Sequence, residues 1–319
     1  MRPRKQKLLS IFALLTFLAR RLAGTIPVLL VVSIFVFGFV HALPGDPARL
    51  VAGPEASPQD VENVRVEMGL NGALWQQYAR WLDGTLHLRL GRSIKNRQPV
   101  ATVIGDRFMP TLWLTVVAMI WATVAGIGIG VLCGVRRGKW IDQLGMVFAI
   151  AGLSFPGFWL ALLLIGLFSV RLGWLPTGGY GTWQHFVMPA FTLGIGVAAV
   201  MARFTRSAFV EVTAEDYVRT ARSKGVPERS VVWKHTLRNA LIPVITLTGL
   251  QFGFLLGGSI VIETVFSWPG LGRLLVDSVS YRDYPVIQAE IMIFSLEFVL
   301  INLIVDLLYA VANPEIRLK

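Results

Sequence analysis

The chain has 319 residues, of which 54% are hydrophobic and only 15% are charged, and its mean hydropathy is +0.62. Because soluble domains carry about 25% charged residues, this composition excludes a soluble enzyme or binding module and predicts an all-α integral membrane protein. A net charge of +11 would suggest nucleic acid as the partner of a soluble chain. Here we assign the basic residues to loops that orient the protein, and expect membrane lipid and no nucleic acid as a partner.

The N-terminus is basic and is followed by an apolar stretch, Leu8 to Leu18. A membrane-spanning helix needs about 20 apolar residues, so residues 1–21 are expected to form a cytoplasmic N-terminus with an interfacial elbow helix. The first span follows at residues 22–43. A cleavable signal peptide is the alternative, but Leu43-Pro44-Gly45 offers no small-residue cleavage pattern.

Residues 44–109 (the 44–109 segment) form the one long polar stretch, with amphipathic character from Pro58 to Trp81. We expect an ordered extracytoplasmic segment with short helices. It contains eight Lys and Arg residues, but loops of about 60 residues or more cross membranes largely regardless of charge. The shorter loops therefore decide the topology.

A five-helix core is expected over residues 110–312, which makes six spans in all, followed by a cytoplasmic tail at 313–319. Three positive charges crowd the short loop at Arg136-Arg137-Gly138-Lys139, whereas the next loop has only Arg171. Positive loops stay inside, so both termini and residues 211–238 (the 211–238 segment) are predicted to be cytoplasmic. The later spans are expected at Pro110–Val135, Leu144–Val170, Phe186–Arg203, Leu241–Phe266 and Val286–Ala312.

The 211–238 segment is a polar island that predicts two short helices joined by a corner. Thr213 is expected to cap the first helix with Asp216 as its acidic partner, and Gly225 to end it in a left-handed conformation. Pro227 blocks continuation of that helix and opens the next one.

The first of these helices is amphipathic. Ala214, Tyr217, Val218 and Ala221 form one apolar stripe, and Glu215 and Arg219 are spaced to form an ion pair. One face is therefore expected to dock while the other remains in water.

The sequence AEDYVRTARSKG, followed by LRNALIPV, resembles the cytoplasmic coupling segment of ABC-importer permeases of the peptide and nickel class, with Gly225 at its corner. Nearly the whole chain after the first dozen residues shares the resemblance, including LPGDPARL, SFPGFWL and ETVFSWPGLGRLLVDSV. Three stretches (RFMPTLWLT, AVMARFTRSAFVEV and LQFGFLLGGSIVIE) are most similar to permeases of glutathione importers. The chain departs from the wider importer pattern where Leu237-Arg238-Asn239 replaces an expected Leu-Pro, as in the peptide subclass.

The resemblance implies a permease of the bacterial inner membrane that binds no cofactor itself. Its implied partners are a second homologous permease, two ATP-binding domains that hold ATP and Mg, and an extracytoplasmic substrate-binding protein. It implies that the 211–238 segment seats in an ATPase domain; for Arg222 and Lys224, contact with anionic lipid is the alternative. The residues expected to couple the permease to the ATPase are Glu215, Asp216, Tyr217, Ala221, Arg222, Lys224 and Gly225.

No ATP site is expected in the chain itself. Gly134 to Lys139 is one residue short of a phosphate-binding loop, and Trp140 stands where Ser or Thr is required. We therefore expect a transport subunit that is not an enzyme.

The glycines spaced four apart at 126, 130, 134 and 138 favour close packing of helices within the chain over a dedicated dimer face.

Acidic residues within the spans are candidates for a translocation pathway, because carboxyls are costly in the membrane. Glu290 and Glu297 lie seven residues apart on one stripe of the last span. Arg203 ends the fourth span, where it either meets an anionic peptide or anchors the cytoplasmic side. Glu263 and Trp268-Pro269-Gly270 are candidates for an outer gate or a re-entrant loop, whereas the family resemblance implies a structural scoop that meets the binding protein.

A metal site is not expected, because the four histidines are scattered and Cys133 is the only cysteine. A gradient-driven secondary transporter remains an alternative, with Glu297 as its ion site, although no internal repeat supports it. A scaffold subunit without a pore is a second alternative. Glutathione is the first choice of substrate, with di- or oligopeptides and nickel complexes as alternatives.

Overall fold

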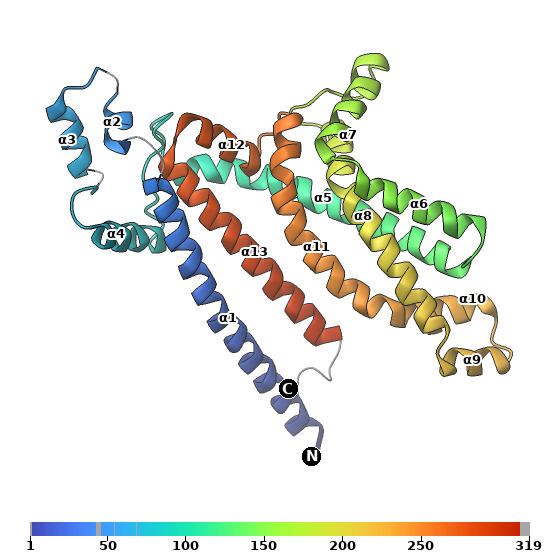
Figure 1. Cartoon of the computed structure of the whole chain (residues 1–319). Coiled ribbons are helices and arrows are strands. Elements are labelled where there is room, and N and C mark those ends of the chain that lie inside the picture. The colour runs from blue at the N-terminus through green and yellow to red at the C-terminus, as the bar shows by residue number, and fades with distance from the viewer. Residues whose placement is uncertain (1, 43–45, 54, 68, 313–319) are drawn as a thin grey trace.

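The computed structural model describes residues 2–42, 46–53, 55–67 and 69–312, and within these ranges the regular elements are helices. Figure 1 shows long helices running side by side between two ends of the molecule. One end, called here the α9 end after the short helix α9 (Asp216–Ser223), also carries the start of α1, the turn between α5 and α6, and the end of α13. The opposite end, called the α12 end, carries α2–α4 and α12. The expected tail at 313–319 lies outside the described residues.

Five helices are long and apolar enough to cross a membrane, and the bent pair α6 and α7 brings the number of candidate spans to six, within the described residues. The five are parts of α1 (Arg2–Ala42), α5 (Val100–Val135), α8 (Trp183–Thr213), α11 (Arg238–Val265) and α13 (Tyr284–Ala312). The expected all-α membrane fold is thus confirmed.

The expected elbow helix is not confirmed, because α1 is continuous from Arg2 to Ala42. Neither Gly nor Pro occurs between Pro3 and Gly24, so nothing in this stretch interrupts the backbone hydrogen bonds of the helix. The candidate span within α1 covers Arg20–His41.

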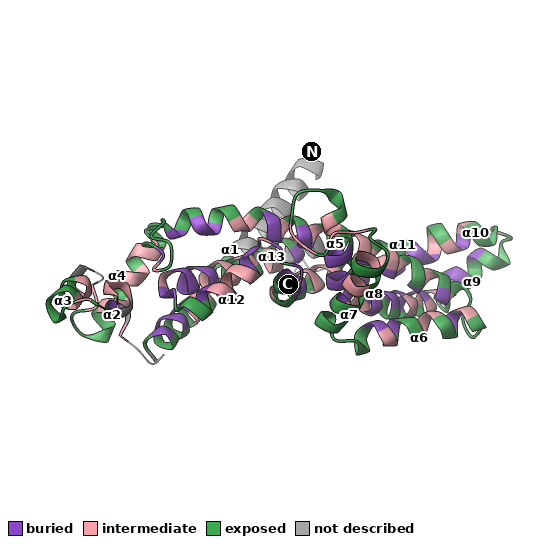
Figure 2. Cartoon of the chain, turned by 90° about the horizontal axis from the view of Figure 1, so that it is seen from above, coloured by how far each residue is buried: buried purple, intermediate pink, exposed green. Residues whose placement is uncertain are grey.

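The 44–109 segment is helical, with α2 at Pro47–Ala52, α3 at Pro58–Glu67 and α4 at Leu74–Leu86. Its helices α2–α4 extend away from the long helices and carry few buried residues (Figure 2), whereas residues 100–109 already belong to α5. Side chains from distant parts of the chain hold the segment. Asp283 accepts hydrogen bonds from the Ser93 hydroxyl and from the Ile94 amide at 3.0 Å, and Ser33 and Tyr78 share one at 2.7 Å.

The most extensive helix pairing joins α5 to α8, and the glycine stripe explains it. A methyl group added at Gly126 would lie 2.5 Å from Cβ of Met201, and one added at Gly130 would lie 2.6 Å from the carbonyl oxygen of Ala202. These glycines therefore pack within the chain, as the sequence analysis favoured.

The expected span from Leu144 to Val170 is not one straight helix but a bent pair. Helix α6 (Trp140–Ser154) ends before Pro156, and α7 (Gly157–Leu164) leaves at an angle of 101° and continues as the π-helical segment η1 (Ile165–Arg171). Proline lacks the amide hydrogen that a helix needs and disfavours helical geometry in the residue before it.

A network of buried side chains joins α5, α11 and α12 (Leu271–Tyr281). Glu263 of α11 accepts a hydrogen bond from the Thr111 hydroxyl at 2.7 Å and one from the Arg273 amide at 3.1 Å. Trp268, also buried, donates to the carbonyl of Pro110 at 3.1 Å. The turn at Trp268-Pro269-Gly270 is therefore fixed against α5 at the α12 end.

Candidate coupling site

The corner at Gly225 has the geometry predicted from the sequence. Helix α9 (Asp216–Ser223) is followed by its C-cap residue Lys224 and then by Gly225, whose φ of +76° lies in the left-handed region. The Gly225 amide donates to the carbonyl of Arg222 at 2.9 Å, and the Val226 amide donates to that of Ala221 at 3.2 Å. This pair of bonds is the Schellman motif, which glycine stabilises because it has no Cβ.

The expected cap at Thr213 is wrong. Helix α8 runs on to Thr213, whose hydroxyl donates to the carbonyl of Phe209 at 2.7 Å, one turn back in the same helix. Glu215 occupies the N-cap position of α9 without a side-chain hydrogen bond. The hydroxyl satisfies a carbonyl of α8 instead of the free amides of α9.

The inner face of α9 forms a small apolar core with the chain that follows the corner. Val218, Ala221 and Val231 are buried together, and Val226 packs against them. Helix α10 (Glu228–Ser230) and the π-helical segment η2 (Val231–Leu237) supply the other side. Ala221 therefore contributes to the shape of the corner from within.

Tyr217 lies at the edge of this core and is 41% exposed. Its hydroxyl donates to the carbonyl of His235 at 3.3 Å and accepts from the Asn239 amide group at 2.7 Å. It thereby ties α9 to the start of α11, the helix that leads back toward the α12 end.

The charged residues of the corner form two ion pairs. Arg222 and Glu228 form an ion pair across the corner at 2.7 Å. The hydrogen bond between them is the main reason that the pKa of Glu228 is lowered and the pKa of Arg222 is raised. Arg219 pairs with Asp216 at 3.5 Å rather than with Glu215 as expected. Glu215, Asp216 and Lys224 are exposed around the corner, so they remain accessible to a partner.

An ion pair that the sequence analysis missed holds the helices behind the corner. Asp142 of α6 accepts from Nε and a terminal nitrogen of Arg206 in α8, at 2.5 and 2.7 Å, and from the Gly138 amide at 2.9 Å. Asp142 is almost fully buried. The missed clue was an acid in the first turn of an apolar span, directly after the basic loop.

The three candidate pathway residues are not brought together by any contact in the described chain. Glu290 is fully buried and neither carboxyl oxygen has a hydrogen-bond partner; Oε2 of Glu297 likewise has none. Arg203 is exposed on α8 and has no contact with either glutamate among the described residues.

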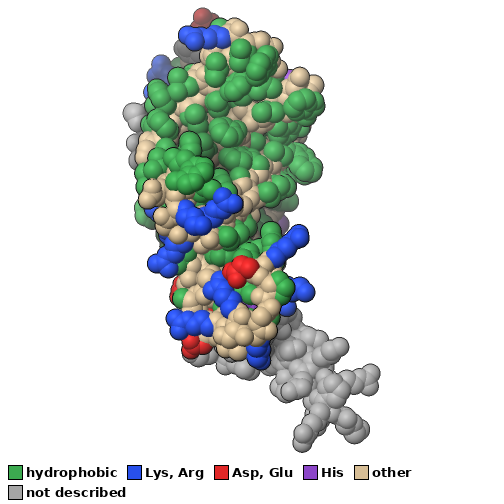
Figure 3. Space-filling view, turned by 90° about the vertical axis from the view of Figure 1, so that its right-hand side faces the viewer, with side chains coloured by type: hydrophobic (Ala, Val, Ile, Leu, Met, Phe, Trp, Pro, Cys, Tyr) green, Lys and Arg blue, Asp and Glu red, His purple; other side chains and the backbone are tan. Residues whose placement is uncertain are grey.

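The surface around this site separates by side-chain type. Figure 3 shows a broad hydrophobic face, with Lys and Arg gathered toward the α9 end. Among the described residues, no group of three His, Cys, Asp or Glu side chains is placed to hold a metal ion.

Comparison with known proteins covers almost the whole chain. Residues 126–318 match the family described as binding-protein-dependent transport system inner membrane component, and residues 14–115 match its N-terminal counterpart. The glutathione transport system permease proteins GsiC of Escherichia coli K12 and of Shigella dysenteriae are each 60% identical to this chain over 306 residues. The aligned residues cover 96% of this chain and 100% of each relative.

Two solved structures share the fold. The MetNI methionine ABC transporter in an inward-facing conformation matches with a TM-score of 0.58 at 22% identity, over 67% of this chain and 98% of that one. An amino acid ABC transporter with histidines matches with a TM-score of 0.53 at 19% identity, over 66% and 94%. Taken with the family matches, these comparisons show that the chain belongs to the inner-membrane permeases of ATP-driven, binding-protein-dependent ABC importers, and that it is most similar to the glutathione permeases.

Proposed function

We propose that this permease forms one half of the translocation pathway of an importer for glutathione or related small peptides. The proposed substrate rests on the relatives, which are 60% identical and are named as glutathione permeases. The proposed route of energy input rests on one observation: an exposed, preorganised corner at Gly225, between the long helices α8 and α11.

ATP and Mg belong, in this proposal, to two ATP-binding partner domains, and a second homologous permease completes the pathway. An extracytoplasmic binding protein delivers the substrate at the α12 end. The α9 end then faces the cytoplasm together with both termini, as the basic loop at 136–139 favours. Movement of the ATPase domains is passed to α8 and α11 through the corner.

Within the corner, we assign two kinds of role to the predicted coupling residues. Glu215, Asp216 and Lys224 are exposed and contact the ATPase domain at its surface. Ala221, Tyr217 and Arg222 hold the shape of the corner by packing, hydrogen bonding and ion pairing, while Gly225 allows the turn.

For the pathway, Glu297 is the strongest candidate because it is only partly buried and one carboxyl oxygen has no partner in the described chain. Glu290 lies two turns away on the same helix and is fully buried, so in this proposal it does not contact the substrate and affects the pathway only indirectly. Arg203 is exposed near the α9 end, where it can meet an anionic peptide as it leaves.

The experiment is uptake of labelled glutathione in cells that lack this chain and in cells whose only copy is Gly225→Asp. The matched control is Gly173→Asp, because Gly173 also has a left-handed φ (+63°) and open space around it but lies far from the corner in sequence. Uptake should be lost in the deletion and fall at least tenfold in Gly225→Asp, with normal membrane levels, and should persist in Gly173→Asp.

The other outcomes separate the parts of the proposal. Uptake that is lost only in the deletion would refute coupling through the corner. Unchanged uptake in the deletion would reject glutathione as the substrate, and dipeptides, oligopeptides and nickel complexes would then be tested in the same cells.

A further inference from the structure

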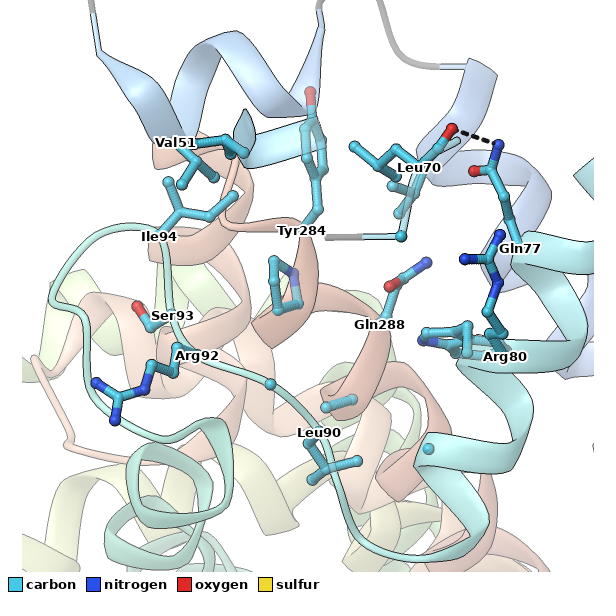
Figure 4. Close-up of a pocket in the computed structure, with 18 of the residues that line it drawn as sticks. Val51, Leu70, Gln77, Arg80, Leu90, Arg92, Ser93, Ile94, Tyr284 and Gln288 are labelled. Carbon is cyan, nitrogen blue, oxygen red and sulfur yellow. Dashed lines mark hydrogen bonds between the residues drawn. The ribbon is translucent and has the colours of Figure 1, made fainter. Parts of the chain in front are cut away.

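A cavity of about 1190 Å³ lies at the α12 end, between the 44–109 segment and the adjoining ends of α1 and α13 (Figure 4). Phe37 and Val40 of α1 and Ala289 of α13 contribute apolar lining, and Trp81 of α4 lines another side. Pockets for small ligands measure roughly 300–1,000 Å³ and combine apolar walls with a few polar groups. This cavity has room for a short peptide together with bound water.

Two nearly buried polar side chains of α13 line this cavity. Tyr284 is 3% exposed, and its buried hydroxyl has no hydrogen-bond partner in the described chain; Gln288 is 8% exposed and presents its carboxamide among the lining residues (Figure 4). The two lie four residues apart, hence on one face of the helix. Figure 4 shows both extending from α13 among the lining residues. Because buried polar groups in folded proteins are almost always hydrogen-bonded, the Tyr284 hydroxyl requires a partner from outside the described chain, and the Gln288 carboxamide on the same face can bind the same partner.

The cavity also has an excess of positive charge. Arg80, Arg89, Arg92 and Arg97 line it, whereas Asp60 is its one acidic lining residue in the described chain. Asp60 is already engaged, since it accepts hydrogen bonds from the amide and hydroxyl of Ser57. The cavity therefore favours an anion.

Arg80 is the guanidinium best placed to bind that anion. It donates to the backbone carbonyls of Asn71 at 2.7 Å and Gln76 at 3.3 Å, so it is held in place, and it has no carboxylate partner in the described chain. Figure 4 shows it on α4, beside Gln77 and on the far side of Gln288 from Tyr284. A guanidinium held by backbone carbonyls is a preorganised site for a carboxylate.

We propose that this cavity binds a short peptide with a free carboxylate before it enters the membrane-spanning helices. Gln288 and Tyr284 hydrogen-bond the amide groups of the peptide, and Arg80 binds its carboxylate. The inference rests on the proposed function and deepens it, because glutathione carries two carboxylates and two amide bonds. A phospholipid headgroup would also satisfy Arg80, but it offers no amide to Gln288.

The test is equilibrium dialysis of labelled glutathione against the permease complex in lipid nanodiscs, without the binding protein. Gln288→Leu and Arg80→Gln should each weaken binding at least tenfold, and Tyr284→Phe about threefold. The matched controls are Gln59→Leu and Arg49→Gln, which make the same substitutions at exposed positions outside the cavity and should stay within twofold of the wild type. Glutathione diamide, which lacks both carboxylates, should bind at least tenfold more weakly to the wild type, and Arg80→Gln should remove that difference.

Affinities of Gln288→Leu and Arg80→Gln within twofold of the wild type would overturn the inference, as would absence of saturable binding by a complex that still imports glutathione. In both cases the proposed function stands. If the complex imports no glutathione, the proposed function fails, and the cavity is then tested by dialysis with other di- and tripeptides. Peptide binding that Gln288→Leu and Arg80→Gln weaken would support the peptide site. Absence of peptide binding would overturn it. Copurification of an anionic phospholipid that depends on Arg80 and that peptide does not displace would identify a lipid site and overturn it too.

Discussion

The 211–238 segment and the 44–109 segment are both polar stretches between apolar helices, yet different contacts hold them. The corner at Gly225 is closed by backbone hydrogen bonds between residues three to five apart. The other segment depends on side chains almost 200 residues away, because Asp283 binds Ser93 and Ile94. The first is therefore shaped largely by its own sequence, whereas the second takes its position when distant parts of the chain, at α1 and before α13, are in place.

The largest effect is expected from Asp283→Ala, which removes the shared acceptor of the Ser93 hydroxyl and the Ile94 amide. Buried donors left without an acceptor cost about 1–3 kcal/mol each, so the 44–109 segment should detach from α13. Hydrogen exchange measured by mass spectrometry should rise at least tenfold over residues 90–97 and stay unchanged over 216–230. Asp60→Ala, an exposed acid in the same segment, is the control; equal exchange in both variants would show that Asp283 does not hold the segment.

A smaller effect is expected when Gly225 gains a side chain. A left-handed φ costs a β-branched residue roughly 1–2 kcal/mol, whereas Asn adopts it readily. No atom lies within 4 Å of an added Cβ, so the backbone alone decides. Gly225→Val should raise hydrogen exchange over α9 several-fold and Gly225→Asn should raise it by less than twofold. Equal changes in the two variants would point to crowding rather than backbone conformation.

Tyr217→Phe should weaken the corner by about 1 kcal/mol, the usual net contribution of a hydrogen bond. The variant loses the bonds to His235 and Asn239 but keeps the ring. The measurement is hydrogen exchange of α9 in Tyr217→Phe, Asn239→Leu and the double variant. Strictly additive effects would mean that the two side chains do not act through their shared bond.

The smallest effect concerns pH. The Glu228 pKa is lowered by its bond to Arg222, so the stabilisation is present above the unfolded pKa of about 4.3 and is lost as the pH falls through the lower folded pKa. The pair is 40% and 61% exposed, so the contribution is at most about 1 kcal/mol. Trp233 fluorescence between pH 3 and 7 should show a transition below pH 4.3 that Glu228→Gln abolishes. A transition that persists in this variant would belong to another carboxyl.

Local chemistry explains which features could be predicted. The corner followed from Gly225 and Pro227 because backbone conformation and the missing amide hydrogen act within a few residues. Pro156 offered the same kind of clue to the break between α6 and α7, but the apolar run around it masked that clue. The Asp142 pair with Arg206 and the cavity beside Tyr284 and Gln288 were out of reach, because each depends on helices that meet only in the folded protein.

The unbroken course of α8 has a mechanical consequence. It runs from Trp183 to Thr213, and 31 residues at about 1.5 Å each make a rod of roughly 46 Å. The glycine stripe of α5 lies directly against it, so the two helices tilt together as a lever. A tilt of about 5° applied at the corner would displace the far end by roughly 4 Å, about the rise of two to three helical residues. A small tilt imposed at the corner would thus become a displacement of several ångströms at the opposite end of α8.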